Sequence, residues 1–352
     1  LHDITKALDG PLQLTLCSQY GKVLDEFSEN NPKTLHALTG SMVAERIFGE
    51  SSQVVAAIES HTTGKRAMND LEKIIYIADY MEPNRDFPGV EELRRLAYTD
   101  LDGALKLGLE MTLAVLREQK QMHLSGGIYH RTQIDLTYNS NHIEGSRLTH
   151  DQTRYIFETN TIGITDESVN VDDIIETTNH FRCIDLIIDR ADERLSESFI
   201  KELHRVLKGG TSDSRREWFA VGEYKRLPNE VGGNDTTPPE EVQREMQALL
   251  REYNAKRTKS LDDIIDLHHR FECIHPFQDG NGRVGRLIMF KECLAHGHVP
   301  FIITDELKMF YYRGLQHWPH IKGYLMDTCL TAQDNYKTLM AYFKVRSLSS
   351  DM

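Results

Sequence analysis

This 352-residue sequence has no long apolar run, only five cysteines and fewer basic than acidic residues. No stretch approaches the ~20 apolar residues of a membrane-spanning helix, and no secretory signal is visible. The scattered, odd-numbered cysteines favour reduced thiols over a disulfide framework. A formal net charge of −13 argues against general nucleic-acid binding, because nucleic-acid phosphates would be repelled. We therefore expect a cytoplasmic protein with no membrane or nucleic-acid partner.

Strand-like patterns are also scarce, whereas apolar residues recur at helical spacing through most of the chain. Helices are predicted over residues 171–189, 196–207, 261–274, 284–295 and 331–343. The length allows two domains of ordinary size. Ser125, Gly126 and Gly127 form a short flexible junction between them. The sequence thus predicts an all-α chain with one small β-hairpin, divided into domains at residues 1–124 and 128–352.

The segment HPFQDGNGRVGR, residues 275–286, contains the side chains needed to handle a phosphate chain. Gly280 and Gly282 can adopt backbone angles closed to other residues, so N–H groups can converge on an anion at the following helix. Asp279 offers hard oxygen ligands to Mg²⁺ bridging phosphates. Arg283 and Arg286 share a helix face and can fork onto phosphate oxygens.

His275 precedes this phosphate-binding turn and is placed to take a proton. A neutral imidazole is a suitable general base at physiological pH, and here it would deprotonate an attacking hydroxyl while the turn holds the α-phosphate. The reaction implied is nucleotidyl transfer. Phe277 is expected to pack beneath the loop.

These twelve residues satisfy every fixed position of the Fic motif H-x-F-x-[D/E]-G-N-G-R-x-x-R, and residues 128–352 resemble a Fic domain. The resemblance implies a helical domain that uses Mg²⁺ and ATP to modify a hydroxyl side chain of a target protein. It makes His275 catalytic and Asp279 the magnesium ligand. It also implies a nucleotide-binding set composed of Gly280, Asn281, Gly282, Arg283 and Arg286.

Residues 140–145, SNHIEG, resemble the inhibitory pattern [S/T]-x-x-x-E-[G/N] of some Fic proteins. The resemblance implies that Glu144, on an N-terminal inhibitory helix, pairs with Arg286. An arginine held by a carboxylate cannot also bind a γ-phosphate, so ATP would bind poorly or with its α-phosphate misaligned. The alternative is that Glu144 is an ordinary exposed helix residue.

Gly222, Tyr224 and Arg226 resemble the start of a substrate-docking flap hairpin, with its turn at Gly232 and Gly233. An edge strand there could hold a target loop by main-chain hydrogen bonds. An irregular surface loop is the alternative.

Two tyrosines and two histidines lie in this domain outside the motif. Tyr311 and Tyr312 stand where family members place an aromatic residue near the nucleotide, and core packing is the equal alternative. His268 and His269 lie on a predicted helix, and we expect them to pack rather than to bind a metal.

The first part of the chain contains residues typical of a metal site: His2, Asp3, His36, His61 and Asp79. Imidazoles and carboxylates together suit one or two divalent transition metals such as iron or manganese. To about Lys120 this region resembles the YqeK type of HD hydrolase, which splits diadenosine tetraphosphate symmetrically. That family places its first ligand histidine before the His-Asp pair, and this chain starts at Leu1. We therefore expect an incomplete site in an N-terminally truncated domain, without competent hydrolysis.

The main hypothesis is a protein adenylyltransferase that moves AMP from ATP to a Ser, Thr or Tyr hydroxyl and is inhibited by Glu144. One alternative is a metal-dependent hydrolase of dinucleoside polyphosphates. Others are a Fic enzyme that uses another nucleotide or removes AMP, and a non-enzymatic regulator that uses the HD region for docking. The sequence leaves the target and any homo-oligomer open.

Overall fold

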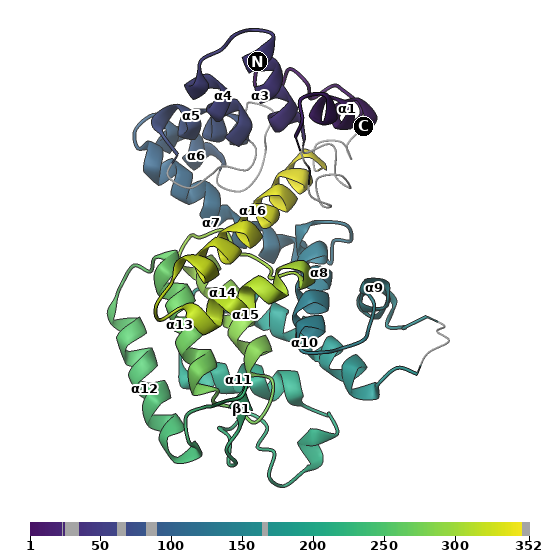
Figure 1. Ribbon diagram of the computed structural model, residues 1–352, viewed down its shortest axis with the longest axis vertical. Helices are drawn as coiled ribbons and strands as arrows, with labels where there is room; N and C mark the ends of the chain where they lie inside the picture. The colour runs from purple at the N-terminus through teal and green to yellow at the C-terminus, as the bar shows by residue number, and fades with distance from the viewer. Residues whose placement is uncertain (23, 25–34, 62–67, 82–89, 164–167, 347–352) are drawn as a thin grey trace. The chain divides into compact units, whose positions relative to one another are not determined.

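A computed structural model describes residues 1–352 except 23, 25–34, 62–67, 82–89, 164–167 and 347–352 (Figure 1). The chain forms two compact units, residues 1–112 with 334–352 and residues 113–333. Almost all regular structure in the described part is helical, which confirms the all-α prediction. The long helices α7 (Leu101–Gln121) and α16 (Gly323–Arg346) each contribute residues to both units.

The described part of the first unit contains short helices. They are α1 (Gly10–Gln19), α3 (His36–Arg46), α4 (Ser52–Ser60), α5 (Asp70–Tyr80) and α6 (Val90–Ala97). A capping box starts α5, because Asn69 accepts from the Glu72 backbone while the Glu72 side chain accepts from the Asn69 backbone. Two small apolar clusters hold these helices, one centred on Cys17 and Met42 and the other on Ile77 and Leu93.

The second unit is built around α14 (Asn281–Ala295), in which nearly every residue is buried. Around it are α8 (Ile128–Ile143), α9 (His150–Thr159), α10 (Val171–Asp189), α11 (Glu197–Lys208), α12 (Pro239–Ala255), α13 (Leu261–Ile274) and α15 (Lys308–His317). Two short strands, β1 (Glu230–Val231) and β2 (Asn234–Asp235), pair antiparallel. A helix buried on all sides has no face open to solvent, so α14 is the core element against which the site is assembled.

Helix boundaries follow the sequence closely where caps are strong. The predicted helix 261–274 is α13, whose start is a capping box between Ser260 and Asp263. The predicted helix 284–295 begins earlier, at Asn281, because the turn before it is completed by Gly280 alone. The two compact units divide between Thr112 and Leu113, within the continuous helix α7. The boundary predicted from the sequence lies after residue 124. The sequence-based domain division stays a prediction.

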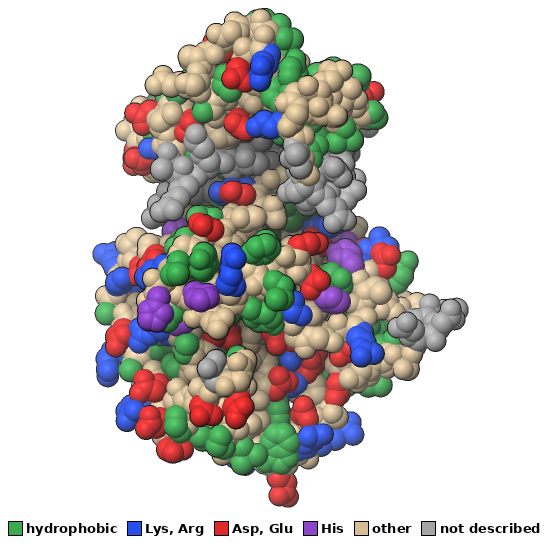
Figure 2. All heavy atoms as spheres, in the orientation of Figure 1, with side chains coloured by type: hydrophobic (Ala, Val, Ile, Leu, Met, Phe, Trp, Pro, Cys, Tyr) green, Lys and Arg blue, Asp and Glu red, His purple; other side chains and the backbone are tan. Residues whose placement is uncertain are grey.

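All five cysteines are unpaired, and four of them are buried. Among the described residues, no helix is both long enough and apolar enough to cross a membrane. Acidic and basic side chains are interspersed on the face shown in Figure 2.

Candidate active site

The loop between α13 and α14 is held in a sharp, defined shape. His275 ends α13 in the left-handed region, with φ of 51°, which is uncommon for a residue other than glycine. Gly280 starts α14 with φ of 82°. The side chain of Asn281, the first residue of α14, accepts from the Phe277 backbone N–H and donates to the Phe277 carbonyl, both at 2.8 Å. Asn281, which was predicted to bind nucleotide, therefore stabilises the loop through its side chain.

Phe277 packs beneath the loop, as predicted, with no exposed surface. Its ring stacks on His204 of α11 at 4.0 Å between centroids. The Gly222 N–H donates to His204 Nδ1 at 2.9 Å, so Nε2 carries the proton and donates to the Asp279 carbonyl at 3.1 Å. Burial lowers the His204 pKa to about 3, which keeps this imidazole neutral. His204 is a support of the loop that the sequence did not reveal.

The candidate base, His275, is largely buried beside Lys225. Burial, and then repulsion from the Lys225 charge, lower the His275 pKa to about 4, so the imidazole is neutral at physiological pH. Its Nδ1 is buried, 3.9 Å from Glu272 Oε2. Lys225 donates to Asn229 Oδ1 and Thr236 Oγ1, both at 2.6 Å, and burial lowers its pKa to about 8. Lys225 belongs to no sequence motif, so its place beside His275 was not predicted from the sequence.

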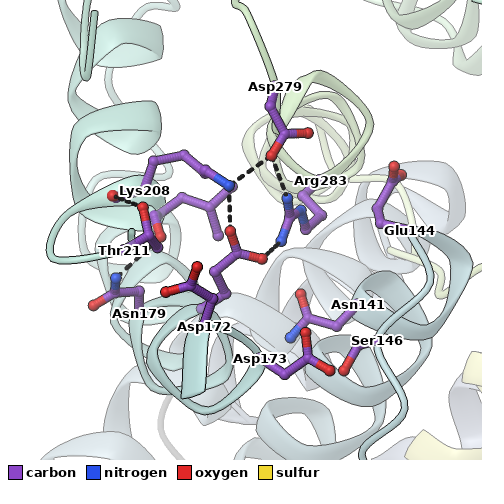
Figure 3. A network of polar contacts seen from close by, with 12 residues as sticks. Asn141, Glu144, Ser146, Asp172, Asp173, Asn179, Lys208, Thr211, Asp279 and Arg283 are labelled. Atoms are coloured by element: carbon purple, nitrogen blue, oxygen red, sulfur yellow. Dashed lines mark hydrogen bonds and ion pairs between the residues drawn. The ribbon is translucent and has the colours of Figure 1, made fainter. Parts of the chain in front are cut away.

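Asp279 lies in a network of charged side chains (Figure 3). Its Oδ2 is 2.5 Å from Lys208 Nζ and 3.4 Å from Arg283 Nη2. Glu176 of α10 accepts from both of these cations. Burial favours the neutral acid, but Arg283 and Lys208 outweigh it and lower the Asp279 pKa to about 2. An ionised, partly exposed carboxylate is a suitable oxygen ligand for Mg²⁺.

Arg286 is occupied by the end of α8. It donates to Ser140 Oγ at 3.0 Å, to the Ser140 carbonyl at 2.9 Å and to Glu144 Oε1 at 2.7 Å. Burial opposes ionisation of Glu144, but Arg286 and Arg283 outweigh it and hold the Glu144 pKa below its usual range. The structure thus brings together the pair expected from the resemblance. It also gives Ser140 a role, because that residue fixes the same guanidinium.

Gly282 does not have the backbone role predicted for it. It lies in the first turn of α14 and is absent from the residues with positive φ, so only Gly280 uses the left-handed region. A Cβ at Gly282 would lie 2.3 Å from Glu144 Oε1 and 2.9 Å from Arg286 Nη1. Glycine at this position leaves room for the Glu144 carboxylate where it lies in the structure.

The hairpin lies later in the chain than the three predicted flap residues. Gly232 and Gly233 form its turn, with φ of 58° and 79°, which fits the type I′ geometry favoured in two-residue hairpins. The strands begin at Glu230, beyond Gly222, Tyr224 and Arg226, which are outside the hairpin.

Gly222, Tyr224 and Arg226 instead have partners in the protein. Gly222 donates to His204, Tyr224 to Glu197 Oε2 at 2.9 Å and Arg226 to the Glu217 carbonyl at 3.1 Å. The hairpin is linked to the motif loop by Asn229, which donates to the Phe277 carbonyl at 3.0 Å.

The two tyrosines of α15 have different environments. Tyr311 is buried, and its hydroxyl is 2.6 Å from His268 Nε2, which makes it a core residue. Tyr312 is 41% exposed and donates to the Ile143 carbonyl at 3.3 Å, so it lies at the surface. His268 and His269 pack, the latter against Trp318, as predicted.

In the first unit, three of the predicted ligands converge. Atoms of His2, Asp3 and His61 that could bind a metal lie within 4.8 Å of one another. The His61 Nδ1 is 2.6 Å from the Ile58 carbonyl, so it carries the proton and Nε2 keeps its lone pair. That Nε2 is buried without a hydrogen bond, 3.4 Å from Asp3 Oδ1. Two facing atoms without a hydrogen bond fit a bound cation.

The other two predicted ligands lie nearby. His36 Nε2 is 3.5 Å from Asp3 Oδ1. Asp79, near the end of α5, is outside the converging group, although its charge acts on His2. Burial opposes ionisation of Asp3, but its close contacts with His61 and with the Lys6 ammonium outweigh it and hold the Asp3 pKa well below its usual range.

Both parts of the chain are similar to known proteins. Residues 194–293 match the Fic/DOC family. Over 64% of its length the chain is 28% identical to "Protein adenylyltransferase Fic" of Drosophila grimshawi and covers 44% of that protein. A solved "Fic domain containing signaling protein" from Bacteroides thetaiotaomicron is 26% identical, with a TM-score of 0.50 over 70% of this chain and 94% of that one.

A second relative has a different chemistry. Over 26% of its length the chain is 44% identical to "Bis(5'-nucleosyl)-tetraphosphatase, symmetrical" of Bacillus subtilis and covers 50% of that protein. The chain thus spans half or less of these two curated relatives. Its second part is thus similar to Fic-domain proteins, and the region before it is similar to HD-type bis(nucleosyl)tetraphosphatases.

Proposed function

We propose that this chain is a protein adenylyltransferase that transfers AMP from ATP to a Ser, Thr or Tyr hydroxyl and is held inactive by Glu144. The observation that carries the proposal is that one loop and the start of α14 together present a neutral imidazole, an ionised carboxylate and two arginines. Relatives with the same domain are named for this activity.

The residues divide the chemistry between them. Mg²⁺ bound at Asp279 would neutralise phosphate charge. Arg283 and Arg286 would orient the phosphate chain, which requires that Arg286 leave Glu144. His275 Nε2 takes the hydroxyl proton, because Nδ1 faces Glu272. The hydroxyl oxygen then bonds to the α-phosphorus, the α–β bridging bond breaks and pyrophosphate leaves.

Mass spectrometry of the intact Glu144→Gly protein with Mg²⁺-ATP tests this function. We expect a gain of one AMP by self-modification, because Arg286 becomes free to bind nucleotide. The matched control is the Glu144→Gly, His275→Ala double variant, which should gain nothing. A gain that survives in the double variant would remove His275 from the mechanism. No gain in any sample, with a protein substrate mixture also unmodified, would count against ATP as the donor.

A second candidate function is supported by the convergence of His2, Asp3 and His61. We propose that the first unit is a metal-dependent hydrolase of dinucleoside polyphosphates, in which these side chains hold a divalent metal. The purified protein should contain iron or manganese by elemental analysis. It should split diadenosine tetraphosphate, and a chelator should stop the reaction.

Asp3→Ala should remove both the metal and the hydrolysis, whereas His275→Ala should leave both unchanged. Metal content that is equal in wild type and Asp3→Ala would contradict this assignment. Metal binding without hydrolysis would match the expectation from the sequence that the site is incomplete.

A further inference from the structure

Four charged side chains from separate elements meet beside the motif loop. Glu176 comes from α10. Lys208 ends α11, and Asp279 and Arg283 flank the start of α14 (Figure 3). Lys208 contacts one oxygen of Glu176, and Arg283 contacts the other. Both cations also contact Asp279 Oδ2. Glu176 and Asp279 therefore share the same two cations.

The burial of these groups is uneven, and this gives Asp279 an inner and an outer oxygen. The Lys208 side chain is 3% exposed, whereas that of Asp279 is 46% exposed. The second oxygen of Asp279 points away from the network (Figure 3). A cation that binds Asp279 from solvent therefore meets a carboxylate whose inner oxygen already has an ammonium at 2.5 Å.

The charges of the four groups cancel, since two are cations and two are carboxylates. Arg283 belongs to the Fic motif, but Lys208 and Glu176 lie outside it. Removing the Lys208 charge would leave the cluster with one negative charge, which attracts a divalent cation. Removing the Glu176 charge would leave one positive charge, which repels it. Interactions among such buried groups are screened less than those at an exposed surface.

We propose that Lys208 and Glu176 are positioning residues that set how strongly Asp279 binds a divalent cation. Lys208 weakens binding of the free cation by occupying the inner oxygen, and Glu176 limits this effect by sharing the ammonium. The metal then binds well only together with the negative charge of a nucleotide. The inference rests on the proposed function for the role of Asp279, but its test requires no turnover.

The test is a titration of the full chain with Mn²⁺, without nucleotide, followed by the electron paramagnetic resonance signal of the free ion. All proteins carry Asp3→Ala, so that the first unit does not contribute. Adding Asp279→Asn gives the baseline. Relative to the parent, Lys208→Met should bind Mn²⁺ about tenfold more tightly and Glu176→Gln about tenfold more weakly. The double variant should return close to the parent.

Two controls separate charge from structure. Lys208→Arg keeps the charge and should stay close to the parent. Thermal melting identifies any variant that fails to fold. A merely structural role would weaken Mn²⁺ binding in both single variants, and that result, or no change in either, would overturn the proposal. If AMP transfer is absent but the opposite shifts occur, the proposed function fails while this inference stands.

Discussion

Replacing Glu144 with glycine is expected to raise the initial rate of AMP transfer by about 100-fold, the size of effect that a displacement of about 1 Å at a reacting centre can cause. In the resting protein, Arg286 is bound to Glu144 at 2.7 Å and to two atoms of Ser140. Removal of the carboxylate leaves this buried cation without its ionic partner, so it gains by pairing with a phosphate. Initial rates measured against ATP concentration should show a higher maximum rate and a lower KM for ATP.

Glu144→Gln is the matched control, because it keeps the shape of the side chain and removes only its charge. Its amide oxygen can still accept from Arg286, so its rate should lie between those of wild type and Glu144→Gly. ATP should also raise the melting temperature of Glu144→Gly more than that of wild type. If both variants transfer AMP at the wild-type rate, the contact with Arg286 is structural and does not inhibit the enzyme.

The parts of this site that could be predicted from the sequence are those that depend on residues adjacent in the chain. The motif loop and the limits of α13 follow from a short pattern and a capping box. The error at Gly282 has the same origin. Two glycines around Asn281 suggest a turn, but Gly280 alone supplies the left-handed residue, and the helix has started before Gly282.

The supporting residues could not be predicted, because each looks like an ordinary residue of an amphipathic helix or a loop. Glu176 contacts Lys208, 32 positions later, and Arg283, 107 positions later. His204 likewise contacts Phe277 and Asp279 of the motif loop, and the Lys225 backbone N–H donates to the Pro276 carbonyl at 2.8 Å. The flap residues were misplaced for this reason, since Gly222 and Tyr224 are held by His204 and Glu197. Only the packed helices reveal which of many similar charges meet.

The second large effect is expected in the pH dependence of the base. His275 can take a proton only when it is neutral, that is, above its pKa. Since burial and Lys225 lower that pKa to about 4, transfer by the Glu144→Gly protein should stay nearly constant from pH 8 to pH 5.5 and fall below pH 5. An ordinary histidine would already have lost about half of its activity near pH 6.5. Initial rates at saturating Mg²⁺-ATP across this pH range measure the acid limb of the pH–rate profile directly.

Substitution of Lys225 tests the cause of this shift. Lys225→Met removes a positive charge beside His275, so the His275 pKa should rise and the acid limb should move toward neutral pH. Lys225→Arg keeps the charge and should keep the limb near the parent position. Dividing each variant's rate by the parent's rate at the same pH cancels the titration of ATP itself. Because burial is the larger cause, the limb of Lys225→Met should remain below that of an exposed histidine. A limb already at pH 6.5 in the parent would mean that His275 is well solvated, and that Lys225 has no part in setting its proton affinity.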